Sequence, residues 1–201
     1  MDPLDLIHLQ ITLEYQLDLA GNLVPFAGSS EQARYIVYKY SGGYRWYYRY
    51  DLPTQVRSQL AEQDPDNAFE QPEQVINILS QDGSVDPSGP FISGYFDHKP
   101  AVSEPLQLKL LDGCFVIVVD NRPVAWAGSE RNNTACAEVA VETLLEFRRR
   151  GFARQVTAAW ANHILHQGLV AFYSYHADNL PSQALANSLG VVQYAECMAF
   201  T

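Results

Sequence analysis

The most constraining feature of this 201-residue sequence is the stretch from residue 136 to residue 166. Its first part, 136–144, is a mostly apolar run typical of a buried strand, and its last part, 151–166, carries apolar residues on one face at helical spacing. A strand that turns directly into a helix is a unit of α/β folds. The flanking segments extend this order with predicted strands at 114–119, 124–129, 169–175 and 191–200 and a helix at 181–189.

Three consecutive arginines, Arg148, Arg149 and Arg150, precede Gly151 at the start of the predicted helix. The first N–H groups of a helix have no partners within it, and the helix dipole places positive potential there. Cations at this end are unfavourable by roughly 0.3–1 kcal/mol each. An anionic ligand, most simply a phosphate or pyrophosphate, would reverse that penalty. The alternative is a solvated charge run beside a glycine that relaxes the turn.

Composition and charge exclude several classes of protein. Hydrophobic residues make up 47 %, enough for a sizeable core, and the net charge of −10 argues against nucleic-acid binding. The apolar run 114–119 is too short to span a bilayer. Three cysteines without paired spacing and a start that lacks a basic segment indicate a reduced, cytoplasmic protein with no membrane association.

The N-terminal half has a different character. Strict alternation over 7–19 predicts a long half-buried strand, and two aromatic segments around Ser41-Gly42-Gly43 predict a hairpin. Helices are expected near 53–62 and 72–81, because a proline stands at the start of each. We divide the chain into an N-terminal half, 1–105, and a core, 106–201.

Two motifs resemble those of the GNAT superfamily of acyl-CoA-dependent N-acetyltransferases. The segment Arg148-Arg149-Arg150-Gly151-Phe152-Ala153 resembles its (Gln/Arg)-x-x-Gly-x-(Gly/Ala) pyrophosphate loop, and Asn179-Leu180-Pro181-Ser182 with the residues up to Gly190 resembles its second motif. The resemblance covers roughly 106–201. It implies an α/β fold with a mixed, mostly antiparallel sheet, helices on both faces and an enlarged N-terminal half that forms the acceptor side.

The resemblance also implies where acetyl-CoA would bind. Backbone groups of Thr143 and Leu145 would meet the pantetheine arm, and the N–H groups of 149–153 would hold the pyrophosphate. Arg148, Arg149 or Arg154 could pair with the outer phosphate. Asn179 and Ser182 would lie beside the cofactor, although their spacing fits an ordinary helix cap equally well.

Acetyl transfer to an amine calls for a general base. An alkylamine with a pKa near 10.4 is neutral at pH 7 at a cost of roughly 4.6 kcal/mol. Glu138 and Glu142 lie on one face of the predicted strand, because they are four residues apart. The resemblance implies a carboxylate upstream on this strand, which makes Glu138 the first candidate base and Glu142 the second. Strand-end or cross-strand charges are the alternative role for both. The resemblance implies that a backbone N–H near Thr143 holds the oxyanion.

One position departs from the family. Many members carry a tyrosine as acid toward the leaving thiolate where this chain has Ala186. Another group could donate that proton, with Tyr194, Tyr175, His176 and Ser182 as candidates, or the thiolate could leave unaided.

Other candidate sites are weaker. His163 and His166 lie three apart without a third ligand, so we expect no metal site. The cysteines are expected to be core thiols, and the aromatic hairpin is explained by sheet packing, with an acceptor pocket as the alternative.

The sequence therefore predicts an enzyme that transfers an acetyl group from acetyl-CoA to an amine of a small molecule or peptide by direct attack. The alternative is a catalytically silent acyl-CoA-binding module for sensing or protein interaction, which Ala186 favours. A third interpretation makes the strand at 7–19 a homodimer element.

Overall fold

A computed structural model describes residues 1–29, 32–101 and 108–201 of the chain. They form two compact units, one of Met1–Ile92 with Tyr194–Thr201 and the other of Ser93–Gln193. The division expected between residues 105 and 106 lies outside the described residues. Strands β5 (Pro87–Tyr95) and β11 (Val192–Phe200) each contribute to both units.

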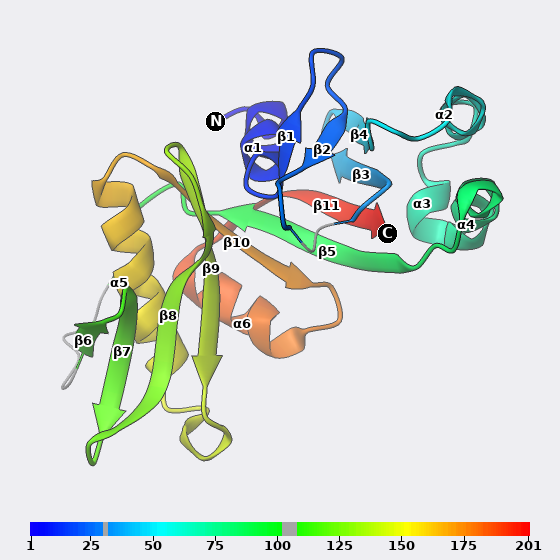
Figure 1. Cartoon of the computed structure of the whole chain (residues 1–201). Helices are drawn as coiled ribbons and strands as arrows, with labels where there is room; N and C mark the ends of the chain where they lie inside the picture. Colours follow the sequence, from blue (N-terminus) through cyan, green and yellow to red (C-terminus); the bar gives the residue numbers. More distant parts are fainter. Residues whose placement is uncertain (30–31, 102–107) are drawn as a thin grey trace. The chain divides into compact units, whose positions relative to one another are not determined.

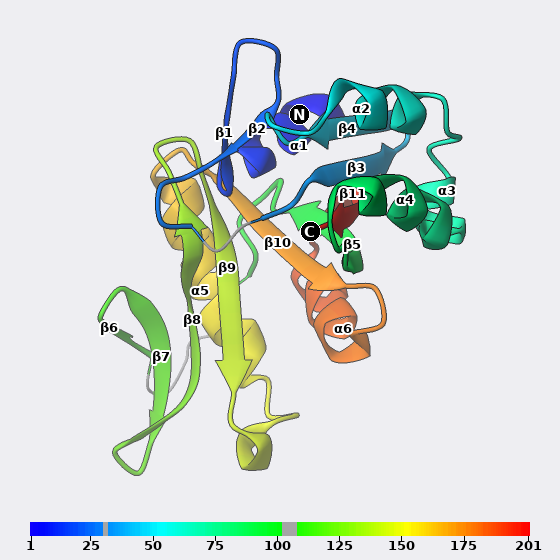
Figure 2. The same ribbon diagram turned by 45° about the vertical axis from the view of Figure 1, so that its right-hand side comes forward.

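The first unit is built on the antiparallel strands β3 (Tyr35–Tyr40), β4 (Gly43–Tyr48) and β11, with β3 in the middle. Helices α2 (Thr54–Ala61), α3 (Asn67–Glu70) and α4 (Pro72–Leu79) follow, and a single 3-10 turn, Ser80–Asp82, ends the last of them. Apolar residues of α2 and α4 pack on the sheet face that carries Tyr35, Val37 and Phe200. The aromatic hairpin and both expected helices are thereby confirmed (Figure 2), although Pro72 begins α4 whereas Pro53 is the N-cap residue that precedes α2.

The prediction of a strand over 7–19 is wrong for most of these residues. Residues Pro3–Ile11 form helix α1, and only Tyr15–Leu17 form a strand, β1, which pairs with β2 (Leu23–Pro25). Asp2 caps the helix by accepting a hydrogen bond from the Leu4 N–H at 2.8 Å, and Pro3 occupies its first position. The buried residues Leu6, Ile7, Gln10 and Ile11 follow helical spacing, which the alternating pattern concealed.

The second unit contains the strands β6 (Leu108–Leu111), β7 (Cys114–Val119), β8 (Arg122–Asn132), β9 (Cys136–Thr143) and β10 (Val170–His176), adjacent in that order. All pairs are antiparallel except β9 with β10, which is parallel. Helix α5 (Phe152–His166) connects these two strands, and α6 (Leu180–Leu189) follows β10. The predicted mixed, mostly antiparallel α/β fold is confirmed.

The core of the second unit lies between α5 and the sheet. Trp160 of α5 is 1 % exposed, and its indole N–H donates to the Ser129 hydroxyl at 3.0 Å. Ala125, Ala137 and Ala171 of the strands are fully buried beneath the helix, and α6 adds Ala186 and Leu189 to the same cluster. Small residues on the sheet let α5 approach closely, which fixes where its first turn lies relative to the end of β9.

Candidate active site

The two parallel strands of the second unit separate near their carboxyl ends. Their paired residues are Cys136 with Val170, Ala137 with Ala171 and Glu138 with Phe172. Beyond these pairs β9 continues to Thr143 and β10 to His176, and Figures 1 and 2 both show the strands pointing apart. The diverging strand segments leave backbone edges in the second unit that a ligand can pair with.

The turn between β9 and α5 presents the first amides of the helix. Gly151 is the N-cap residue in the left-handed conformation, at φ 77° and ψ 5°, and no side chain caps the helix. A Cβ at Gly151 would have no described atom within 4 Å. Arg149 also has a positive φ, 61°. The turn therefore holds an unusual backbone conformation that leaves room for an anion at the helix N-terminus.

The arginines of this turn bind carbonyl oxygens rather than carboxylates. The side chains of Arg148, Arg150 and Arg154 donate to the carbonyls of Thr143 at 3.1 Å, Glu146 at 3.2 Å and Ser188 at 3.3 Å. Within the described ranges none of these three, nor Arg149, forms an ion pair. A protein with net charge −10 thus keeps four uncompensated positive charges within seven residues. The positive potential of these arginines favours the binding of an anion at this turn.

Thr143 and Leu145 flank the end of β9. Thr143 is 9 % exposed, and its hydroxyl is buried without a hydrogen-bond partner among the residues that the structure covers. Leu145 is 76 % exposed, which is unusual for leucine. Phe152 and Ala153, the first helical residues of α5, are half-buried. An unpaired hydroxyl and an exposed apolar side chain at one strand end are features that a bound ligand would satisfy and cover.

The second motif residues form a helix cap. The Asn179 side chain accepts a hydrogen bond from the Ser182 N–H at 3.1 Å, and the Ser182 carbonyl accepts one from the Tyr173 hydroxyl at 3.4 Å. This is the ordinary cap that the sequence spacing also fitted. The cap holds the start of α6 beside the end of β10, so both residues border the diverging strands. Their contact with a cofactor stays a prediction.

The two candidate bases differ in environment. Glu138 is 5 % exposed, and its carboxylate lies 3.3 Å from the Arg131 guanidinium of β8, whereas Glu142 is exposed. Sequence reasoning did not single out Arg131. The β8–β9 hairpin was the available signal, because it places Arg131 opposite Glu138. A buried carboxylate between charged and apolar neighbours can be held in one position, which an exposed one cannot.

The candidate proton donors also differ. Burial raises the pKa of Tyr175, so its hydroxyl stays protonated at neutral pH. His176 binds the Asp178 carboxylate at 2.7 Å through Nδ1, and the Tyr194 hydroxyl donates to the Gln10 side chain within the first unit. Ala186, at the usual tyrosine position, is 3 % exposed in the core.

The described residues hold neither a metal-binding cluster nor a membrane-spanning helix. Across 1–29, 32–101 and 108–201, no group of three or more histidine, cysteine or acidic side chains is arranged to hold a metal ion. No helix in those same ranges is both long and apolar enough to cross a membrane.

Comparison with known proteins relates the C-terminal part of the chain to one family. Residues 113–200 match the family model of the GNAT acetyltransferases. An acetyltransferase of the GNAT family from Colwellia psychrerythraea aligns with 100 % of this chain and 97 % of its own, at 14 % identity and a TM-score of 0.55. A GNAT-family protein from Novosphingobium aromaticivorans aligns with 59 % of this chain and 65 % of its own, slightly less than two thirds, at 19 % identity and a TM-score of 0.50. No curated protein matches the sequence.

Proposed function

We propose that this chain transfers an acetyl group from acetyl-CoA to an amine, because residues 113–200 match the family model of the GNAT acetyltransferases, whose chemistry is acyl transfer. The observation that carries this proposal is the uncapped N-terminus of α5, with Gly151 in the left-handed conformation and arginines that lack carboxylate partners. The family match supports acyl transfer in general. That acetyl-CoA is the donor and an amine the acceptor is the part that we propose.

The residues of the turn fit a pyrophosphate. The N–H groups of 149–153 would donate to its oxygens, and the absence of a Cβ at Gly151 lets those oxygens approach the backbone. Arg149 and Arg154 carry charge for an outer phosphate. The Arg148 guanidinium is held by the Thr143 carbonyl, which links the phosphate loop to the strand that would meet the pantetheine arm.

The diverging strands fit the pantetheine arm and the thioester. A ligand lying along the end of β9 could pair with backbone groups near Thr143 and Leu145, as a further strand would. A backbone N–H near Thr143 would then stabilise the oxyanion that forms when the amine attacks. Asn179 and Ser182 would border the ligand from the start of α6.

The reaction requires one proton to leave the amine and one to reach sulfur. The amine nitrogen forms a bond to the carbonyl carbon, the carbon–sulfur bond breaks, and the thiolate takes up a proton. We assign the base to Glu138, acting directly or through a water, because its burial and its pairing with Arg131 fix its carboxylate. Tyr175 is the preferred acid of the candidate donors, since its raised pKa keeps it protonated.

The acceptor is expected to be an amine of a small molecule or a peptide, and the negative net charge favours a cationic one. A cytoplasmic location and the absence of nucleic-acid and membrane partners are further parts of this proposal. The long strand over 7–19 that suggested a homodimer is not present, because residues 3–11 form a helix.

Two measurements test the proposal. Calorimetry with acetyl-CoA should give saturable binding, and release of free thiol across a panel of amines should identify turnover. We expect Glu138→Gln to lose turnover by roughly 10²-fold or more with acetyl-CoA binding intact, whereas the exposed neighbour variant Glu142→Gln keeps both. Failure to bind acetyl-CoA would refute the proposal.

A second candidate function rests on one observation. Ala186 is buried in the core where many relatives carry the acid, which favours a silent acyl-CoA-binding module. Binding of acetyl-CoA without thiol release on any amine would support the module.

A further inference from the structure

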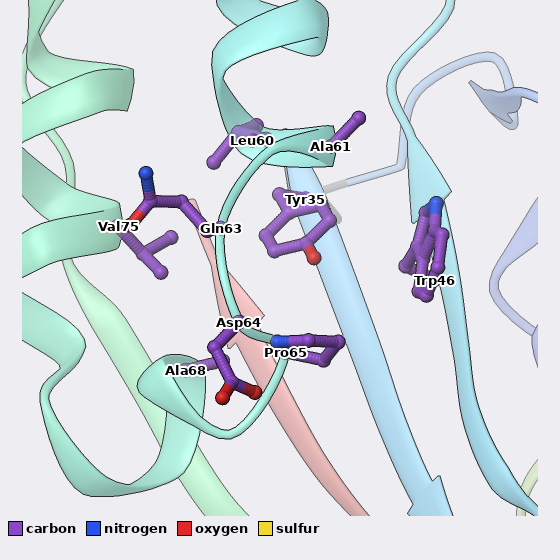
Figure 3. A pocket seen from close by; sticks show the side chains of 9 residues that line it. All are labelled: Tyr35, Trp46, Leu60, Ala61, Gln63, Asp64, Pro65, Ala68 and Val75. Carbon is purple, nitrogen blue, oxygen red and sulfur yellow. The ribbon is translucent and has the colours of Figure 1, made fainter.

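The aromatic hairpin of the first unit borders a hollow that has room for only about one water molecule (Figure 3). Tyr35 of β3 and Trp46 of β4 line it together with the loop that follows α2. The carboxylate of Asp64, in that loop, accepts a hydrogen bond from the Asp66 N–H at 3.1 Å. This hollow therefore gives no support to an acceptor pocket at the hairpin.

The Arg148 side chain of the second unit makes a contact unlike those of the other arginines near the start of α5. Its Nε–H donates to the Thr143 carbonyl at 3.1 Å in a partly buried position. The hydrogen bonds that Arg150 and Arg154 donate to carbonyl groups lie on the exposed surface. Of these three arginines, Arg148 is therefore the one that reaches back to the end of β9.

The peptide group between Thr143 and Leu144 is held at both ends. The Leu144 N–H donates to the Val124 carbonyl at 2.9 Å, and the Thr143 carbonyl accepts the hydrogen bond from Arg148. Val124 of β8 is fully buried, so the core fixes the first of these partners. Arg148 supplies the second partner and thereby limits the rotation of this peptide group.

The main chain of Arg148 binds the same segment. A single 3-10 turn, Leu145–Phe147, follows β9, and the Arg148 N–H donates to the Leu145 carbonyl at 3.3 Å. Side chain and main chain of one residue thus both hold the segment in which β9 ends. Because Arg148 also stands three residues before Gly151, it connects the end of β9 to the turn proposed to hold the pyrophosphate.

We propose that Arg148 is a positioning residue for acyl transfer, which acts through the Thr143–Leu144 peptide and not through its charge. A backbone N–H near Thr143 would stabilise the oxyanion, and such a donor is effective only within hydrogen-bond distance of the oxygen. A displacement of about 1 Å can lower a rate by about 10²-fold. This role depends on the transferase function proposed above, whereas the two hydrogen bonds of the peptide group can be tested without a ligand.

Three substitutions separate the hydrogen-bond donor from the charge. In Arg148→Gln the side-chain nitrogen stands as many bonds from the backbone as Nε does, so a donor is kept without a charge. Arg148→Lys keeps the charge but puts a methylene group at that place, and Arg148→Met keeps neither. We expect kcat for thiol release to fall by roughly tenfold to a hundredfold in the Lys and Met variants. The Gln variant should keep the kcat of the wild type.

Binding of acetyl-CoA should not distinguish the Gln and Met variants. Both lack the same positive charge, so their dissociation constants for acetyl-CoA should be equal by calorimetry. The loss in Arg148→Met relative to Arg148→Gln is therefore expected in kcat and not in affinity. Urea denaturation shows whether each variant is folded under the conditions of the assay.

Arg150 provides a matched control in the same turn. It bonds the Glu146 carbonyl through Nη2 on the exposed surface, so the position of its Nε is not used. Arg150→Gln and Arg150→Met remove the same charge and should have equal kcat values. Equal kcat values for Arg148→Gln and Arg148→Met, or full kcat in Arg148→Lys with a low one in Arg148→Gln, would overturn the proposal.

Hydrogen exchange of the Leu144 amide tests the peptide group in the free protein. This amide should exchange severalfold faster in Arg148→Met than in the wild type, and Arg148→Gln should restore its protection. Unchanged exchange in Arg148→Met, with turnover intact in the wild type, would overturn the role of Arg148 alone. A wild-type protein that does not bind acetyl-CoA would instead overturn the transferase function and with it any role in catalysis.

Discussion

Replacing Gly151 by alanine tests whether the N-terminus of α5 binds a phosphate group. Gly151 has a φ of 77°, where an L-residue with a side chain is less stable than glycine by about 1 kcal/mol. No described atom lies within 4 Å of the added Cβ, so no steric cost is expected in the free protein. The free energy of unfolding should therefore fall by about 1 kcal/mol, a loss that a folded domain tolerates.

The effect on acetyl-CoA binding should be larger. The added methyl group occupies the space through which the pyrophosphate would reach the first amides, and a lost hydrogen bond to a charged group weakens binding by about 1.5–3 kcal/mol. The dissociation constant should thus rise by roughly tenfold to a hundredfold. Isothermal titration calorimetry measures this change, and urea denaturation measures stability on the same samples.

Gly168 offers a matched control on the same helix. It follows the other end of α5 with a φ of 76°, and a Cβ there would likewise meet no described atom within 4 Å. Gly168→Ala should lose the same stability, while the N-terminus of the helix, about 22 Å away along a 15-residue helix, is untouched. Equal affinities of the two variants for acetyl-CoA would refute the assignment of the pyrophosphate to the α5 N-terminus.

Three further predictions concern the first unit. Asp2→Ala removes the cap of α1 and should lower the free energy of unfolding by about 1 kcal/mol in urea, an effect that a strand over these residues would not give. Leu79→Ala, at a fully buried position of α4, should cost about 2–5 kcal/mol in the same assay. The hydrogen bond from Lys39 lowers the pKa of Asp66 below 3.8. The pair therefore stabilises the fold fully when the pH is above the pKa of Asp66 in the unfolded chain, and this stabilisation is lost as the pH falls through the lower pKa of the folded protein. Asp66→Asn should therefore flatten the stability profile at the acidic end, and an unchanged profile would argue against the pair.

Much of the second unit was predictable because its signals are local. The strand at Cys114–Val119 and the helix after Gly151 have the predicted bounds to within a residue, since apolar runs and a glycine turn mark them directly. The turn with Arg148 to Arg150 was singled out by its charge, by the helix dipole and by the resemblance of its motif to a pyrophosphate loop. The β8–β9 hairpin was predictable, but the pairing of Glu138 with Arg131 within it was not, because it depends on a register shift between Ser129 and Arg131.

The first unit shows the limit of periodicity. Residues 7–19 alternate as a strand would, but the Asp2 cap and Pro3 start a helix whose buried residues are spaced by three and four. By itself the sequence determined the acidic character of the chain, the arginine- and glycine-containing turn before α5 and the order of elements from residue 114 onward. Each of these depends on residues that are neighbours in the chain. Only the tertiary structure decided that Glu138 is buried and Glu142 exposed, because burial and partners depend on residues that are distant in the chain.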